Sequence, residues 1–289
     1  MAKKDKTIQQ IDSDYTPKVD SLKIQNQLFI ARKDTSVGRA YYNMGAEDNE
    51  RDYIYSATTI LNVLDKGYGF KSWLKLNGHK CDDIMNEAAD KGTFIHICNS
   101  ILAAGEDLPS NIKIKNTRTG EDEEITPKIA KNIEAFIKFY RENNPVIMGI
   151  EIMLYDVELP FAGTVDYIMV LKDKKDPSKP RLSIVDLKTG KEYPKFHELQ
   201  LTCYKMLFDK IYGKRFGEIG EIDDLYCLYT RDTGNYTLKK YKYCPEEWTS
   251  CVHLFHYMNS NARGKMPTIK EDAEYPEYYT LKEEKNDGK

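Results

Sequence analysis

The sequence predicts an α/β fold in which helices flank a central mixed β-sheet. Two observations support this fold class. Apolar residues recur at helical spacings of three and four as far as residue 143, and they then alternate with a period of two between residues 146 and 188. A further helical segment, two strand-like segments and a last helical segment follow. This order of elements is typical of a sheet covered by helices.

The helical segments of the first half are bounded by recognisable start and stop residues. The best defined of them begins at Thr126-Pro127 and is closed by Asn143-Asn144-Pro145. Residues between 105 and 126 are expected to form a polar loop. The helices expected in this N-terminal helical region cover residues 56–66, a stretch through Trp73, residues 82–104 and residues 127–143.

The strand-like segments begin directly after this region. The first three are separated by short gaps, one of which is the basic loop KDKKDPSKPR, and short gaps favour an antiparallel meander. A helix over about 194–212 follows, and Pro145 and Pro245 stand where the first strand and the last helix begin. The expected strands cover residues 146–155, 164–171, 182–188, 223–229 and 236–243.

The length of 289 residues suits one large domain with appendages. Residues 1–50 are interpreted as a polar N-terminal arm, residues 51–265 as the folded domain and residues 266–289 as a charged C-terminal tail. No apolar run is long enough to span a bilayer, and the lysines near the N-terminus precede no apolar segment. We therefore expect a cytoplasmic protein without a membrane partner.

Charge and cysteine content narrow the function classes. The net charge of -3 gives no overall attraction to nucleic acid, so any such contact must come from local patches. The six cysteines are scattered and form no CxxC pair, which indicates reduced thiols.

Acidic residues interrupt three of the apolar strands. Asp186 and Lys188 lie two apart in IVDLKTGK, so they face the same side of a strand with Cα atoms about 7 Å apart. Asp166 lies in the strand before it, in FAGTVDYIMV, and Glu151 lies one strand earlier. Burying a lone carboxylate is costly, so these acids on one sheet predict a shared partner.

A divalent cation is the simplest such partner, because Mg²⁺ binds carboxylates while it keeps waters and phosphates as further ligands. With a lysine beside the cation, a water could attack phosphorus, which indicates phosphodiester hydrolysis. Each residue also has an ordinary explanation. Asp186 and Lys188 could be a cross-strand ion pair, Asp166 could end a turn and Glu151 could face solvent.

Two helical motifs accompany the acids. Gly92 and His96 lie four apart, so they share one helix face on which the glycine permits a close approach. Gln200 and Tyr204 are also four apart, on the helix that follows the IVDLKTGK strand. His96 by itself could be a hydrogen-bonded helix histidine, and core packing could explain Tyr204.

In this order, the motifs resemble the RecB-like exonuclease branch of the PD-(D/E)XK nuclease superfamily, which includes phage-type exonucleases. The resemblance covers about residues 56–212 and implies an αβββαβ, restriction-endonuclease-like core. It also implies a set of ligands for Mg²⁺ or Mn²⁺, namely His96, Asp166, Asp186 and the backbone carbonyl of Leu187.

The resemblance further implies roles in catalysis and substrate binding. Lys188 would position or activate the attacking water beside the catalytic carboxylates, and Glu151 would support the metal site or a second ion. Gln200 and Tyr204 would contact the scissile strand or buttress the site, and Thr189 would contact a phosphate.

The resulting hypothesis is a metal-dependent DNA exonuclease that acts on linear ends or single strands in replication, recombination or repair. A replication or recombination protein is a candidate partner. Two alternatives stay open: an endonuclease of the same fold, and an inactive nuclease fold that binds DNA or protein. Some relatives hold an iron–sulfur cluster through a late CxxC, and because this chain lacks that motif, no cluster is expected.

Overall fold

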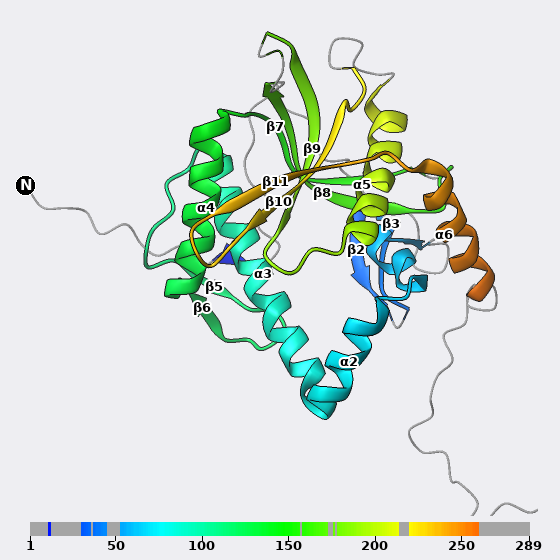
Figure 1. The fold of residues 1–289 in the computed structure, drawn as a ribbon, viewed down its shortest axis with the longest axis horizontal. Coiled ribbons are helices and arrows are strands. Elements are labelled where there is room, and N and C mark those ends of the chain that lie inside the picture. The colour runs from blue at the N-terminus through cyan, green and yellow to red at the C-terminus, as the bar shows by residue number, and fades with distance from the viewer. Residues whose placement is uncertain are drawn as a thin grey trace, which may run out of the picture.

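The protein is described by a computed structural model that covers residues 11–12, 30–35, 37–44, 53–156, 158–172, 176, 178–213 and 220–259. Its centre is a five-stranded sheet with the strand order β11-β10-β9-β8-β7 (Figure 1). Helices cover the sheet, which confirms the mixed α/β fold. The strands are β7 (Val146–Tyr155), β8 (Ala162–Lys172), β9 (Pro180–Lys188), β10 (Asp224–Thr230) and β11 (Tyr236–Tyr241).

The sheet is mixed because one connection is a helix. β7, β8 and β9 form the expected antiparallel meander. Helix α5 (Pro194–Phe208), continued by a π-helical turn at Asp209–Gly213, then returns the chain so that β10 pairs parallel to β9. β11 adds to the outer edge of β10 in the antiparallel sense.

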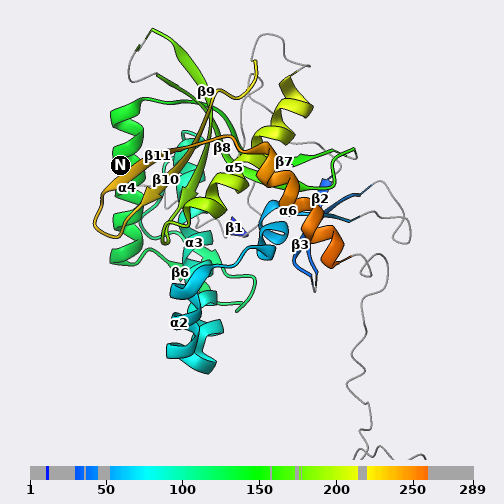
Figure 2. The same cartoon turned by 45° about the vertical axis from the view of Figure 1, so that its right-hand side comes forward.

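Two helical layers bury the two faces of the sheet (Figure 1 and Figure 2). Trp248 is fully buried on one face, where it packs edge-on against Phe161. Phe136 packs against Tyr167 on the other face. Burial of both faces explains why the strands are nearly continuous apolar runs. The first layer contains α1 (Ala57–Ile60), a 3-10 turn (Leu61–Val63), α5 and α6 (Pro245–Met258), and the second contains α3 (Cys81–Ala103) and α4 (Pro127–Asn143).

The ends of α4 follow from its terminal residues. The Thr126 hydroxyl accepts a hydrogen bond from the Ile129 N–H, which satisfies one of the free donors of the first turn. At the other end, Asn144 has a φ of 42° and stops the helix in a left-handed conformation. The predicted boundaries of this helix are confirmed.

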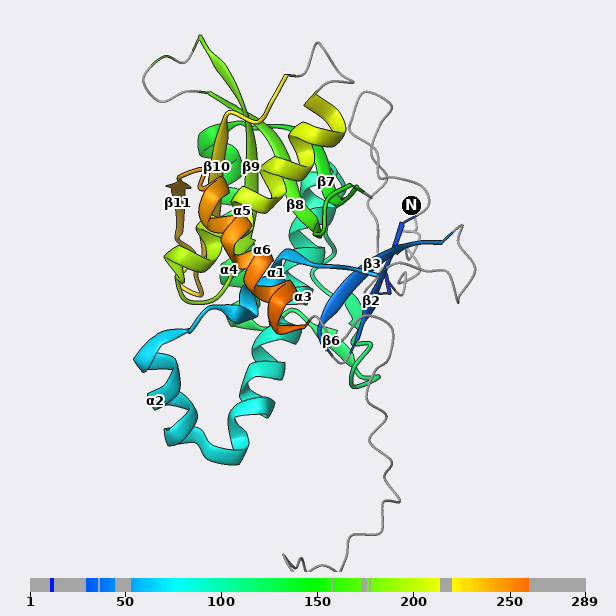
Figure 3. The same ribbon diagram turned by 90° about the vertical axis from the view of Figure 1, so that its right-hand side faces the viewer.

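Helix α2 (Gly67–Asn77) projects away from the sheet, together with a 3-10 turn (Gly78–Lys80) and the first half of α3 (Figure 3). No residue of α2 is buried, whereas α3 is buried from Phe94 onward. His96 therefore lies in the first turn of α3 that packs on the body of the protein. Among the described residues, no helix combines the length and the apolar character needed to cross a bilayer.

A small sheet packs beside β8 and contains part of the segment interpreted as an arm. The expected boundary at residue 50 falls between its second and third strands. Tyr41 is buried and its hydroxyl lies 2.7 Å from the Thr164 hydroxyl of β8. The division into arm, domain and tail stays a prediction, and residues 266–289 lie outside the described residues. The strands are β2 (Ile30–Asp34), β3 (Arg39–Asn43) and β4 (Ile54–Tyr55).

A second small sheet corrects the expectation of a polar loop after residue 105. There the Asn116 side chain accepts hydrogen bonds from the N–H groups of Arg118 and Thr119, at 2.9 and 3.2 Å, and so forms a tight turn between two short strands. These strands have too few residues for a periodic signal. The sheet contains β1 (Ile11–Asp12), β5 (Lys113–Lys115) and β6 (Asp122–Glu124).

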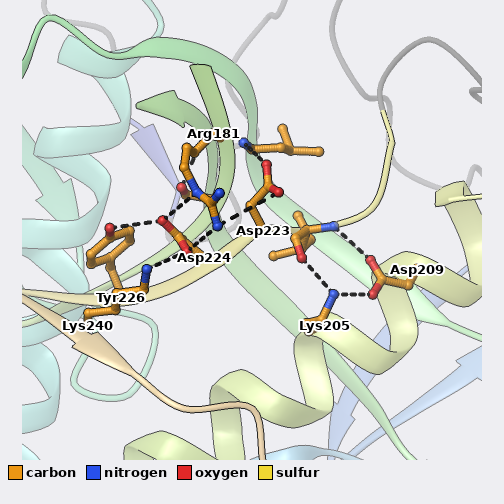
Figure 4. A network of polar contacts seen from close by, with 10 residues as sticks. Arg181, Lys205, Asp209, Asp223, Asp224, Tyr226 and Lys240 are labelled. Carbon is orange, nitrogen blue, oxygen red and sulfur yellow. Dashed lines mark hydrogen bonds and ion pairs between the residues drawn. The ribbon is translucent and has the colours of Figure 1, made fainter. Parts of the chain in front are cut away.

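A network of charges holds the starts of β9 and β10 together (Figure 4). Arg181 donates two 3.0 Å hydrogen bonds to the buried Asp224 carboxylate, and Lys240 lies 2.6 Å from the same group. The neighbouring Asp223 accepts a hydrogen bond from the Leu182 N–H. These acids are paired with basic residues and lie at the opposite end of the strands from Asp186, so they are structural.

Candidate active site

The candidate active site lies where β8 and β9 diverge. Pairing of the two strands runs from Lys172 and Pro180 as far as Tyr167 and Val185. Asp166 and Asp186 are the next residues of the two strands, and here the Leu187 N–H donates a 2.6 Å hydrogen bond to the Asp166 carboxylate. A side chain thus replaces the backbone as the acceptor where the regular pairing ends, and both buried acids contribute to the lining of a cavity.

We call this point between β8 and β9, at Asp166 and Asp186, the fork. β7 adds a third acid to it. Ile150 pairs with Tyr167 and Ile152 with Val165, so Glu151 lies across from Asp166. Helix α3 brings His96 over the same position. Its Nδ1 lies 3.6 Å from Asp166 Oδ1 and 3.9 Å from Glu151 Oε1. His96, Glu151 and Asp166 each place one possible ligand atom within 4.8 Å of the others.

This group of one nitrogen and two carboxylate oxygens fits a hard divalent cation. Imidazole and carboxylate are both ligands of Mn²⁺, and carboxylates are the ligands that Mg²⁺ prefers. Asp186, which was also expected as a ligand, is the least exposed acid of the fork and forms an ion pair with Lys188. The Leu187 side chain points into the opposite core, so only its backbone can face the site.

The acids and His96 change each other's protonation. Burial raises the pKa of Asp166 to about 7, and repulsion from Asp186 and Glu151 adds to this effect, while His96 opposes it. Burial alone would lower the pKa of His96, but attraction to Asp166 and Glu151 outweighs it and raises that pKa to about 9. The raised pKa favours the protonated form of His96, and binding of a cation to its imidazole would release that proton.

Lys188 is held by two neighbours. It forms the ion pair with Asp186 and donates a 3.1 Å hydrogen bond to Gln200 Oε1. Burial lowers the pKa of Lys188, but the Asp186 and Asp166 carboxylates outweigh burial and raise it above its ordinary value. The ammonium group is therefore charged at neutral pH, and it acts as a hydrogen-bond donor rather than as an acceptor of protons.

Helix α5 supports this lysine. The Gln200 amide donates a 2.8 Å hydrogen bond to the Tyr204 hydroxyl, so the two residues, four apart, form a chain that ends on Lys188. The Tyr204 ring lies against Gly163 of β8. A Cβ atom added to Gly163 would lie 2.9 Å from Tyr204 Cδ1 and closer still to Cε1, which explains why this strand position needs glycine.

Thr189 continues β9 beyond the lysine. Its hydroxyl would lie 3.5 Å from a Cβ added to Gly92. The Gly92–His96 motif of α3 and the Asp186–Lys188 motif of β9 therefore lie next to each other at the site. The structure thus gathers around one fork all the site residues that the sequence singled out.

Glu151 has an unusual backbone for a strand residue, with a φ of 51°. In this left-handed region the Cβ atom of an L-residue crowds its own backbone, at a cost of about 1–2 kcal/mol. The distortion lies shortly after a register shift in the β7–β8 pairing, which occurs between Ile147 and Gly149. With this backbone, the Glu151 carboxylate lies near His96.

A pair of variants measures this cost. Both Glu151→Gly and Glu151→Ala remove the carboxylate, but only alanine retains the crowded Cβ atom. We expect the glycine variant to be more stable by about 1 kcal/mol, the reverse of the usual order within a strand. Urea unfolding measures the difference. Equal stability, or a more stable alanine variant, would show that the left-handed backbone depends on the glutamate itself.

Residues of the N-terminal hairpin were missed by the sequence analysis. Arg32, Arg39 and Tyr41 line the same cavity as His96 and Asp186. The signal that could have found them is the pair of short runs IARKD and RAYYN on either side of Thr35-Ser-Val-Gly38, which is typical of a hairpin.

Comparison with known proteins agrees with this geometry. The family model of the PD-(D/E)XK nuclease superfamily matches residues 74–274, which include the whole fork. No curated protein matches the chain.

Proposed function

This chain belongs to the PD-(D/E)XK nuclease superfamily, and on that premise we propose that it is a metal-dependent exonuclease that hydrolyses phosphodiester bonds in DNA. The observation that supports the proposal best is the fork between β8 and β9, where His96, Glu151 and Asp166 approach one another beside the Asp186–Lys188 pair. The fork offers ligands for a cation and a charged donor for the substrate within one cavity.

The proposed ligands of Mg²⁺ or Mn²⁺ are His96, Asp166, Asp186 and the backbone carbonyl of Leu187. Glu151 is proposed to support the metal site or a second ion. When bound, the ion neutralises the charge that develops on the phosphate and lowers the pKa of the attacking water. Asp166 is already oriented by the Leu187 N–H, which favours its role as a fixed ligand. No iron–sulfur cluster enters this proposal.

Lys188 is proposed to position the attacking water and the scissile phosphate. Its raised pKa supports positioning over proton abstraction, because a charged ammonium donates hydrogen bonds and accepts no proton. Gln200 and Tyr204 are proposed to buttress this lysine, since their hydrogen bonds end on it. Thr189, at the end of β9, is proposed to contact a phosphate oxygen.

Action on ends or single strands is proposed from the resemblance of the motifs to the RecB-like exonuclease branch, and the hairpin β2–β3 and helix α3 both line the cavity in which such a substrate would lie. Such a site suits a role in DNA replication, recombination or repair, with a protein of those processes as a partner. The paired carboxylates argue against an inactive binding module, since buried acids are costly to retain without a use.

End-dependent cleavage is the test of this function. Labelled linear and circular DNA are incubated with the protein in Mg²⁺, in Mn²⁺ and in EDTA. We expect linear DNA to be shortened progressively, circular duplex DNA to persist, and EDTA to stop the reaction. Cutting of the circle would identify an endonuclease instead. Binding of both DNAs without any cleavage would identify an inactive module.

A further inference from the structure

We propose that the cavity beside the fork takes a single nucleic-acid strand, and that Arg32 and Arg39 of the β2–β3 hairpin bind its phosphates. The inference rests on the proposed nuclease function, narrows its substrate from ends or single strands to a single strand, and names two residues that recognise it. It concerns strands β2 and β3, within the segment for which the sequence predicts a polar arm.

The cavity has a volume of about 710 Å³, and three parts of the described chain contribute to its lining. The fork supplies the acids and Lys188. Helix α3 supplies the small residues Ala88, Ala89 and Gly92. The hairpin supplies Arg32, Arg39 and Tyr41, and thereby brings two positive charges to a site that is otherwise rich in acids.

The hairpin directs these three residues to one face. Arg32 is the direct partner of Tyr41 across the two strands, and Arg39 lies two residues before Tyr41 on the same strand. Cross-strand partners and residues two apart share a face of a sheet. Because the Tyr41 hydroxyl contacts Thr164, two residues from Asp166, that face is turned toward the fork.

The position of Arg39 is fixed by its backbone. Its carbonyl accepts hydrogen bonds from the Ser56 N–H and from the Thr59 hydroxyl, both at 2.9 Å. The preceding Gly38 packs so closely on Thr59 that an added Cβ would lie 2.7 Å from that side chain. The hairpin is thus held from both sides, and its arginines have a defined place relative to the fork.

The Arg39 side chain can exchange its present partner for a phosphate. It lies 3.2 Å from Asp34, and the two side chains are 44% and 76% exposed. Exposed ion pairs of this kind contribute little stability. A phosphate, in contrast, accepts two parallel hydrogen bonds from a guanidinium group, which favours arginine over lysine at this place.

The size of the cavity favours an unpaired strand over a whole duplex. Its volume falls within the range of pockets for small molecules, about 300–1,000 Å³, which suits a few nucleotides of one strand. The small side chains of α3 leave room for a backbone to pass close to the helix.

Binding of labelled single-stranded and blunt duplex DNA in EDTA, where the chain has no metal for cleavage, tests the inference. Fluorescence anisotropy is measured over a series of salt concentrations for the wild type and for the double variant Arg32→Ala/Arg39→Ala. We expect the variant to bind single strands at least tenfold more weakly. The slope of log affinity against log salt should fall by about 1.4, since each contact with a single strand contributes about 0.7.

Two variants serve as controls. Lys128→Ala/Arg141→Ala removes the same charge from the exposed face of α4, outside the cavity, and should leave the affinity and the slope close to the wild type. Arg32→Lys/Arg39→Lys retains the charge and should recover most of the slope but less of the affinity. Thermal melting verifies that each variant is folded.

Three outcomes would overturn the inference: unchanged binding in the arginine variant, an equal loss in the α4 control, or equal losses for single-stranded and duplex DNA. If the wild type cleaves DNA and the arginine variant binds normally, only this inference fails. If the wild type cleaves no DNA in any metal, the nuclease function fails, and the binding result still decides the role of the arginines.

Discussion

Replacing Asp186 by asparagine is expected to lower the rate of DNA cleavage about a thousandfold or more, while DNA binding in EDTA stays within a few fold of the wild type. Asparagine has the same shape but no charge, so the site loses the carboxylate that pairs with Lys188 and that is proposed to hold the cation. Cleavage of end-labelled linear DNA under single-turnover conditions measures the rate.

Asp224→Asn is the matched control for this experiment. Asp224 is also buried and ion-paired, and it lies on the strand next to β9, but at the far end of the sheet. This variant is expected to lose stability without a comparable loss of cleavage by the folded protein. If Asp186→Asn cleaves at the wild-type rate, or if both variants lose activity to the same degree, the assignment of the site to the fork is wrong.

Replacing Gly163 by alanine is expected to destabilise the fold by about 3 kcal/mol, near the upper end of the usual cost of overpacking. The added Cβ would enter the space of the buried Tyr204 ring, which is held in place by its hydrogen bond from Gln200. Because Gln200 in turn binds Lys188, a displaced ring should also disturb the lysine. Urea unfolding gives the loss of stability.

A double-mutant cycle identifies the cause of this loss. The variant Gly163→Ala/Tyr204→Ala should be less destabilised than the sum of its two single variants, by about 1–2 kcal/mol, because the methyl group then fits the space of the missing ring. Gly190→Ala is the control, since an added Cβ there meets no atom within 4 Å. Strict additivity would show that the glycine is required for another reason.

The succession of helices and strands could be read from the sequence because it depends on local signals. Thr126 and Asn144 bound α4 through hydrogen bonds to their own neighbours, so a short stretch of sequence suffices to place both ends. The apolar runs of β7, β8 and β9 likewise indicate strands buried on both faces. The β5–β6 hairpin escaped because its strands have three residues each, too few for a period to emerge, whereas the β2–β3 hairpin has the weak signal of two short runs around a turn.

The sequence by itself determined which residues could take part in chemistry: the acids on three strands, Lys188 beside Asp186, and His96 with Gly92. Only the tertiary structure decided how they meet. The divergence of β8 and β9, the left-handed backbone at Glu151 and the approach of Arg32 and Arg39 all depend on contacts between segments far apart in the chain. Such contacts arise from the packing of whole elements against one another, whereas local patterns of residues indicate single elements.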